Sequence, residues 1–190
     1  MSDTNEIILV DANGNDTGAM EKMEAHRVGR LHRAFSLFIF NNQRELLLQQ
    51  RAGTKYHSGG LWSNTCCSHP APGETVLQAA HRRLQEELNF DCELREVFSF
   101  TYRADVGNGL IEHELDHVLL GTYDGAFQPN PEEVQACKWI PMNELTSDIS
   151  LDGDSYTNWL RLVIESRISD LQRGAECLYP ASTLDTIAAK

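Results

Sequence analysis

The sequence lacks long hydrophobic runs, and none approaches the about 20 consecutive apolar residues that a helix needs to cross a bilayer. Basic side chains are scarce, because 16 Lys and Arg stand against 28 Asp and Glu and give a formal net charge of -12. Such a chain repels a phosphate backbone at long range, which disfavours nucleic acid as the main partner. Its hydrophobic fraction of 41% is typical of a folded protein and excludes the disordered class.

Cysteine also shows no organised pattern. The five cysteines are odd in number and lack the spacing of a metal finger. The first residues, Met-Ser-Asp-Thr-Asn-Glu, lack the basic and apolar regions of a signal peptide. Together these features predict a protein of the reducing cytoplasm.

The acidic excess is distributed unevenly along the chain. Residues 1–95 hold 10 of the 16 basic side chains and 12 of the 28 acidic ones, so most of the excess lies in residues 96–190. Positive charge that can hold a small anion is therefore concentrated in the first half. A phosphate site is expected there.

The chain shows no internal repeat and no long linker, which predicts one domain over residues 1–190 with a C-terminal tail at about 174–190. Strand patterns run over residues 6–10, 31–40, 45–51, 64–69, 92–104, 110–124 and 134–140, and helical patterns over residues 74–88 and 156–171. Residues 11–18 are rich in turn formers. Mixed strands with two main helices predict an α+β sandwich.

The segment Ile111-Glu-His-Glu-Leu-Asp116 contains two candidate metal ligands. In a strand, side chains alternate between faces, so Glu112 and Glu114 would point the same way and His113 the opposite way. The pair could then share one metal ion. A solvated acidic stripe on a sheet edge is the alternative, and the segment alone favours it.

Three histidines, His26, His32 and His69, add candidate nitrogen ligands. Each one alone is more often an ordinary polar or core residue. Together with Glu112 and Glu114 they would form a nearly closed site for a divalent ion. Mixed nitrogen and oxygen ligation does not choose between Mn²⁺, Mg²⁺ and Zn²⁺.

The same alternation sorts the two adjacent cysteines. In Asn64-Thr-Cys-Cys-Ser-His69, Cys67 shares a face with His69, and Cys66 lies on the other face. Cys67 is therefore the thiol that could share a pocket with a histidine ligand. Cys66 is better explained as a small buried hydrophobic residue.

The predicted helix over residues 74–88 carries Arg82 and Glu86, and Arg83 and Glu87, each pair four residues apart. Such pairs ordinarily stabilise an exposed helix by about 0.3 to 0.5 kcal/mol each. With Glu74, the same residues are also similar to the Nudix box, in which a loop and helix hold acidic side chains that bind Mg²⁺ bridging a diphosphate.

Three positions depart from the Nudix box. Ser68 and Asn89 stand where the box has glycine, and Arg83 stands where it has an acidic residue. Losing that acidic residue removes a helper for phosphate hydrolysis and adds a cation suited to holding a diphosphate intact. The motif therefore favours diphosphate binding over diphosphate hydrolysis.

A wider set of motifs runs from Ile7 to about residue 165. Its stretches are Glu21-Lys22, Arg30-Leu-His-Arg-Ala-Phe-Ser36, Arg51-Ala-x-x-Lys55, Trp62-x-Asn64-x-x-Cys67-x-His69-Pro70, Tyr102-Arg-Ala104, Glu112-x-Glu114 and Trp159. Together they resemble the type 1 isopentenyl diphosphate isomerases. The resemblance implies a Nudix-type mixed β-sheet sandwiched between helices, and isomerisation of isopentenyl diphosphate to dimethylallyl diphosphate in isoprenoid synthesis.

The resemblance also implies roles for individual residues. The divalent metal ligands would be His26, His32, His69, Glu112 and Glu114, and Glu87 would contact a Mg²⁺ that bridges the diphosphate. The diphosphate clamp would be Lys22, Arg51, Lys55 and Arg83, and the acid and base would be Cys67 and Glu114. The expected partner is a small allylic or homoallylic diphosphate, bound by a monomer without membrane or nucleic acid.

The reaction itself accounts for these residue types. Moving the double bond needs one proton added to the terminal alkene carbon and one removed from the neighbouring methylene, through a tertiary carbocation. A thiol and a carboxylate on opposite faces of the substrate can do this. Tyr102 could control the protonation of the carboxylate by a hydrogen bond. Trp159 could stabilise the cation, although a core tryptophan is the alternative. Two other functions remain open: a Nudix diphosphate hydrolase, and a metal-binding scaffold without activity.

Overall fold

The computed structural model describes residues 5–179 of the chain. The strands are β1 (Glu6–Val10), β2 (Asp16–Glu21), β3 (His32–Phe40), β4 (Glu45–Arg51), β5 (Trp62–Ser63), β6 (Cys66–Ser68), β7 (Leu94–Asp105), β8 (Ile111–Thr122) and β9 (Val134–Pro141). The helices are α1 (Lys22–Val28), α2 (Val76–Leu88), α3 (Met142–Leu151), α4 (Asn158–Ser166) and α5 (Ile168–Glu176), and a 3-10 turn lies at Gly153–Ser155.

Strand β3 occupies the centre of a mixed sheet. It pairs in parallel with β8 along its whole length, and in antiparallel fashion with β6 and, at its two ends, with β1 and β4. The remaining strands extend this centre, because β7 pairs with β8, β9 and β5 pair with β4, and β2 pairs with β1. An aromatic and aliphatic sequence that is buried along almost its entire length suits a strand in this position.

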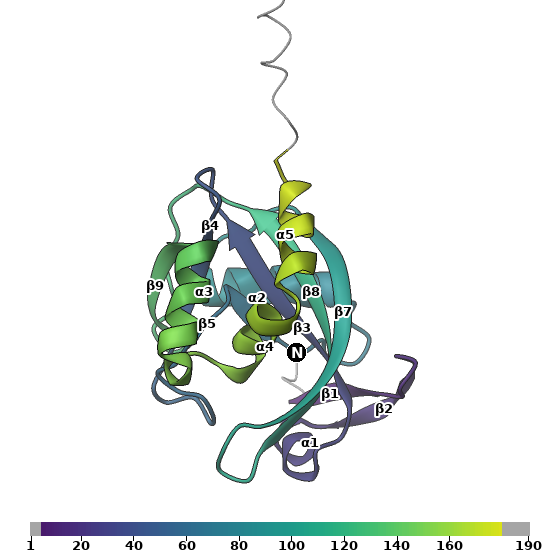
Figure 1. The fold of residues 1–190 in the computed structure, drawn as a ribbon. Coiled ribbons are helices and arrows are strands. Elements are labelled where there is room, and N and C mark those ends of the chain that lie inside the picture. Colours follow the sequence, from purple (N-terminus) through teal and green to yellow (C-terminus); the bar gives the residue numbers. More distant parts are fainter. Residues whose placement is uncertain (1–4, 180–190) are drawn as a thin grey trace, which may run out of the picture.

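Helices cover both faces of the sheet, as Figure 1 shows, with α3, α4 and α5 in front and α2 behind. Phe35, Leu37 and Ile39 of β3 point into the cluster that contains the apolar face of α2. Phe38 and Phe40 point the other way, into the cluster formed with α3, α4 and α5. This arrangement confirms the predicted α+β class, with a mixed sheet between helices.

Helix α2 has well-defined ends. At its start, Thr75 and Gln78 form a capping box, in which each side chain accepts a hydrogen bond from the other residue's backbone N–H. At its end, Asn89 adopts a left-handed backbone with φ 56°. After glycine, asparagine is among the residues that enter this region most readily. Asn89 therefore forms a left-handed turn at the position where the Nudix box has glycine.

Several local predictions needed correction. Strand β2 and helices α1 and α3 were not anticipated. Strand β2 is largely exposed and lacks an apolar pattern, and its pairing with β1 defines it. The single helix predicted over residues 156–171 is interrupted at Arg167, where the backbone has φ -129° and ψ 11°. The apolar period continues across the break because α4 and α5 both turn their apolar residues to one cluster.

The end of the chain is partly described. Ala175, Leu178 and Tyr179, within the stretch predicted as a tail, pack against the same cluster as α4. Residues 180–190 lie outside the described residues. That residues 1–190 form one domain stays a prediction. No helix within residues 5–179 is long and apolar enough to cross a membrane.

Candidate active site

Three adjacent strands bring together an imidazole, a carboxylate and a phenol. In the register between β3 and β8, His32 is the partner of Glu114, and in the register between β7 and β8, Tyr102 is the partner of the same residue. Side chains at such opposite positions lie close together on one face. All three are buried, so the sheet itself fixes their relative positions.

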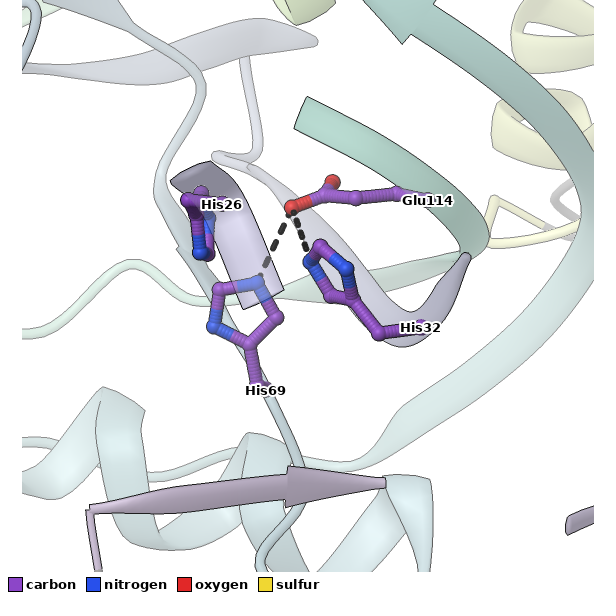
Figure 2. A group of neighbouring side chains, drawn as sticks. All are labelled: His26, His32, His69 and Glu114. Atoms are coloured by element: carbon purple, nitrogen blue, oxygen red, sulfur yellow. Dashed lines mark hydrogen bonds and ion pairs between the residues drawn. The ribbon is translucent and has the colours of Figure 1, made fainter. Parts of the chain in front are cut away.

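His26 and His69 complete a candidate metal centre around Glu114. His26 lies on α1, which Glu21 caps at its start and which ends at Gly29 with φ 65°. One ligand atom from each of His26, His32, His69 and Glu114 lies within 4.8 Å of the others. Figure 2 shows the Glu114 carboxylate reaching between the rings of His32 and His69, with His26 beside them.

In His26 and His32 one ring nitrogen, Nδ1, contacts the backbone, and the other, Nε2, faces the site, where it can bind a metal. Nδ1 of His26 contacts the Lys22 carbonyl at 2.7 Å, and Nδ1 of His32 contacts the Arg30 carbonyl at 2.8 Å. Nε2 of His26 is buried and has no hydrogen-bond partner among the described residues, whereas Nε2 of His32 faces Oε1 of Glu114 at 3.4 Å. Two buried ring nitrogens beside one carboxylate, each ring held by a backbone bond at its other nitrogen, fit a divalent metal.

Glu112 belongs to a second group, with His57 and again His26. Nε2 of His57 lies 3.3 Å from Oε1 of Glu112, and His57 is 4% exposed. The structure therefore divides the predicted set of five ligands into two groups that share His26. His57 was not anticipated, because it lies in the irregular segment before β5 and no spacing rule points to it.

The two carboxylates of β8 have opposite electrostatic environments. Burial and the nearby charge of Glu114 raise the pKa of Glu112 well above its usual range. Burial alone would also raise the pKa of Glu114, but His32 and His69 hold it well below its usual range. The Tyr102 hydroxyl reaches both groups, at 2.9 Å from Oε2 of Glu112 and 2.7 Å from Oε2 of Glu114.

The rings of His26, His57 and His69 are neutral near pH 7. Burial lowers the pKa of His69 to about 3, and burial together with Arg51 lowers the pKa of His57 to about 3. Burial also lowers the pKa of His26. A neutral imidazole can coordinate a metal, whereas a protonated ring cannot.

Cys67 lies on the same side of the sheet as these groups, and Cys66 lies on the other, as the alternation predicts. Cys66 is fully buried in the cluster beneath α2, whereas Cys67 lines the site cavity. The Cys67 sulfur lies 3.0 Å from Oδ1 of Asn64 and 3.4 Å from Oγ of Ser36. Burial and the nearby Asp116 raise the pKa of the Cys67 thiol, so it is protonated near pH 7.

Trp159 closes one side of this cavity. The side chain is 3% exposed, and its indole N–H donates to Oγ of Ser63 at 2.9 Å, which fixes the orientation of the ring. The Arg51 guanidinium lies 5.3 Å from the ring centroid, and the His57 ring meets it edge-on. Trp159 belongs both to the core cluster and to the cavity wall, so the two sequence alternatives describe the same position.

The four predicted clamp residues line one cavity, as does Glu87: these are Lys22, Arg51, Lys55, Arg83 and Glu87. Burial and the charges of three neighbouring cations lower the pKa of Lys22 to about 8. Clustered cations of this kind favour an anionic ligand, because an anion relieves their mutual repulsion. Lys55 also forms an ion pair with Glu133.

The cavity has an inner and an outer part. The inner part has a volume of about 50 Å³ and is lined by Cys67, Glu114 and Trp159 among others. The outer part has a volume of about 340 Å³ and lies against α2. Lys22, Lys55 and Arg83 line both parts, which places these cations at the junction.

The acidic residues of the predicted Nudix box form ion pairs. Glu74 receives two hydrogen bonds from Arg82, both at 2.8 Å, and Arg83 bonds Glu86 and Glu87. The other oxygen of Glu87 accepts a hydrogen bond from Gln49 at 2.9 Å. Both predicted pairs four residues apart are present, and Glu87 is buried beside the cavity.

Comparisons with known proteins agree with this geometry. Residues 30–160 match the NUDIX domain, and the crystal structure of DR0079 from Deinococcus radiodurans has the same fold, with a TM-score of 0.71 and 21% identity over 84% of this chain and 97% of that one. The chain is thus a NUDIX-domain protein.

Within that class, an isopentenyl-diphosphate Delta-isomerase of Pectobacterium atrosepticum is 54% identical over 87% of this chain and 92% of its own length. A second such protein, isopentenyl-diphosphate Delta-isomerase 2 of Aromatoleum aromaticum, is 51% identical over 86% of this chain and 87% of its own length. The chain belongs to the isopentenyl-diphosphate Delta-isomerase family.

Two further polar side chains of this region were missed. Asp116 is buried and accepts a hydrogen bond from Ser36 at 2.8 Å. The alternation that paired Glu112 with Glu114 extends to Asp116, so the signal was present in the sequence. Ser36 gives no comparable signal, because no spacing rule distinguishes one serine in an apolar strand.

Proposed function

We propose that the protein converts isopentenyl diphosphate to dimethylallyl diphosphate by adding and removing a proton through a tertiary carbocation. The observation that carries this proposal is the joint lining of one cavity by Cys67, Glu114 and Trp159, with cations at its mouth. The names of the relatives support the same reaction.

The proposed substrate lies with its two ends in different parts of the cavity. The diphosphate binds at the junction, where Lys22, Lys55 and Arg83 line both parts, and Arg51 supports it from inside. The hydrocarbon then enters the inner part beside Trp159. Fixing the charged end in this way orients the double bond toward the groups that exchange protons with it.

Cys67 and Glu114 are the proposed acid and base. Tyr102 donates to Glu114 and can adjust the protonation of that carboxylate through the hydrogen bond. The buried indole of Trp159 stabilises the carbocation by about 2 kcal/mol through cation–π attraction, and the narrow cavity excludes the water that would capture the cation as an alcohol.

The proposal includes two metal positions. His26, His32, His69 and Glu114 would hold one divalent ion, with Glu112 and His57 beside it, and Glu87 would contact a Mg²⁺ bound with the diphosphate. The first ion would keep Glu114 and the imidazoles in a fixed arrangement, and the second would neutralise diphosphate charge. Mn²⁺, Mg²⁺ and Zn²⁺ remain candidates for the first position. A cytoplasmic monomer stays the prediction for location and assembly.

One experiment tests the proposed reaction against its alternatives. The purified chain is incubated with isopentenyl diphosphate and Mg²⁺ in D₂O, and the products are examined by NMR. The isomerase produces dimethylallyl diphosphate that carries deuterium. A NUDIX hydrolase would release phosphate instead, and a metal-binding scaffold would return the substrate unchanged, so either result overturns the proposal.

Loss of one imidazole tests the first metal position. His69→Ala is expected to weaken binding of a divalent ion at least about 100-fold, since even changes to groups behind the ligands cost about 10- to 100-fold. The measurement is calorimetric titration of metal-free protein with Mn²⁺ and with Zn²⁺. The matched control is His81→Ala on α2, where the ring is partly exposed and pairs with Asp91. Equal affinity in both variants contradicts the assignment.

The lowered pKa of Lys22 gives the clamp a predicted pH dependence. In the free protein Lys22 loses its charge as the pH rises above about 8, instead of above 10.5. Affinity for dimethylallyl diphosphate is therefore expected to fall above pH 8 by up to about tenfold per pH unit. Calorimetry between pH 7 and pH 10 measures this fall.

Lys22→Arg separates this effect from other titrations, because arginine keeps its charge throughout the range. The variant is expected to move the fall in affinity to higher pH. Superimposable pH profiles of the natural protein and the variant would show that Lys22 does not determine the dependence.

A further inference from the structure

Asp116 is a buried carboxyl that forms no ion pair with any residue of the described range 5–179. It is 1% exposed and lies on β8, two residues beyond Glu114 on the same face. Its Oδ2 accepts a hydrogen bond from the Ser36 hydroxyl at 2.8 Å, and its Oδ1 has no hydrogen-bond partner among the described residues. Burying a carboxyl with so few partners costs stability. We therefore expect any functional contribution of Asp116 to act through its hydrogen-bond partner, Ser36.

Ser36 links this carboxyl to Cys67. In the antiparallel register of β3 and β6, Ser36 and Cys67 are direct partners, and Oγ of Ser36 lies 3.4 Å from the Cys67 sulfur. Because the single hydroxyl hydrogen of Ser36 is donated to Asp116, the serine oxygen presents lone pairs to the sulfur.

Asn64 presents an acceptor from the other direction. Its amide N–H groups donate to the Leu37 and Cys66 carbonyls at 3.0 and 3.2 Å, so the orientation of the amide is fixed. Its Oδ1 then faces the Cys67 sulfur at 3.0 Å. The sulfur thus lies between two oriented acceptors, and Asp116 determines the orientation of one of them.

We propose that Asp116 is a positioning residue that acts through Ser36 to fix the place and orientation of the Cys67 thiol in the cavity. The inference rests on the proposed role of Cys67 in isomerisation. Without the carboxyl, the Ser36 hydroxyl can rotate and donate to the sulfur, and the S–H bond loses one of its two acceptors. The thiol then occupies several orientations, of which only some suit proton exchange with the substrate.

A double-mutant cycle tests the pathway through Ser36. Ser36→Ala and Asp116→Leu are each expected to lower kcat about 10- to 100-fold and to leave KM within about threefold, because the diphosphate clamp is untouched. The double variant is expected to resemble either single variant, since both changes break the same connection. Additive losses overturn the inference. If Asp116→Leu does not fold, Asp116→Ala takes its place in the cycle.

Asp116→Asn separates positioning from a general packing role. The asparagine oxygen can still accept from Ser36, so kcat is expected within about threefold of the natural protein. A loss equal to that of Asp116→Leu contradicts the inference. Ser99→Ala, which removes an exposed hydroxyl from the neighbouring strand β7, serves as the matched control and is expected to leave kcat unchanged.

A second measurement does not depend on turnover. The rate at which iodoacetamide alkylates Cys67, followed by mass spectrometry of the peptide that contains it, reports the environment of the sulfur. Ser36→Ala, which leaves the Asp116 carboxyl in place, is expected to change this rate by at least about threefold, and Ser99→Ala is expected to leave it unchanged. Equal rates in these two variants and the natural protein overturn the inference, whereas inactivity of the natural protein in D₂O overturns only the proposed function.

Discussion

Cys67→Ala is expected to lower the rate of isomerisation about 10²- to 10⁴-fold, which is the usual contribution of a positioned acid or base. The expected loss lies in kcat, because the sulfur lines the inner cavity and is not among the cations at its mouth. The fold should persist, because removing one half-buried sulfur changes few contacts. Production of dimethylallyl diphosphate measured by NMR and a thermal unfolding curve provide the two readouts.

Cys92→Ala is the matched control for this substitution. Cys92 is also half-buried, but it packs against the cluster beneath α2, away from the site cavity. Turnover is expected to remain within about twofold of that of the natural protein. A rate above one tenth of the natural value in Cys67→Ala, with Cys92→Ala unaffected, would remove Cys67 from the mechanism.

The parts of the site that lie on single strands could be predicted from the sequence. Alternation along a strand placed Cys67 with His69 and Glu112 with Glu114, because a period of two depends only on local backbone geometry. The structure confirms these shared faces, since the cavity contains all four side chains. The two clusters of apolar residues follow the same rule on β3.

The parts that depend on pairing between strands could not be predicted in this way. The partnership of His32 with Glu114 follows from the parallel register of β3 and β8, which no local pattern specifies. The same limit applies to Ser36 and Cys67, whose contact depends on β3 and β6. The resemblance to a family supplied residues for the site, whereas the register explains why they meet.

Short or irregular segments of the backbone were the second reason why parts of the structure could not be predicted. Helix α1, which carries His26, has only seven residues, and a short helix gives too few turns for an apolar period to be recognised. His57 lies in a segment of turns and bends, without helix or strand, so nothing in the spacing indicates its burial. The single helix expected over residues 156–171 failed for the opposite reason, because a continuous period concealed the break at Arg167.

Glu114→Gln is the second substitution with a large expected effect. The amide is nearly isosteric with the carboxylate and can still accept the Tyr102 hydrogen bond, but it cannot accept a proton as the carboxylate does. We expect the rate to fall about 10²- to 10⁴-fold. Glu96→Gln on β7, where the exposed glutamate forms an ion pair with His117 of β8, is the matched control and should retain full activity.

The stability of Glu114→Gln distinguishes a functional loss from damage to the fold. Glu112 and Glu114 are two buried carboxyls that share one tyrosine. Because His32 and His69 hold the pKa of Glu114 well below its usual range, the charge of Glu114 stabilises the folded state at neutral pH. The metal-free variant is therefore expected to unfold at a lower temperature than the metal-free natural protein, in a single cooperative transition that shows an intact fold.

Weak metal binding alone could also slow Glu114→Gln, because Glu114 lies among the candidate metal ligands. Assays at saturating Mn²⁺ and at saturating Zn²⁺ separate the two causes, with His69→Ala as the comparison because it removes a candidate ligand but no proton-transfer group. We expect excess metal to restore part of the rate of His69→Ala and none of the rate of Glu114→Gln. Equal recovery of both variants would show that Glu114 acts only as a metal ligand and that another residue carries out the second proton transfer.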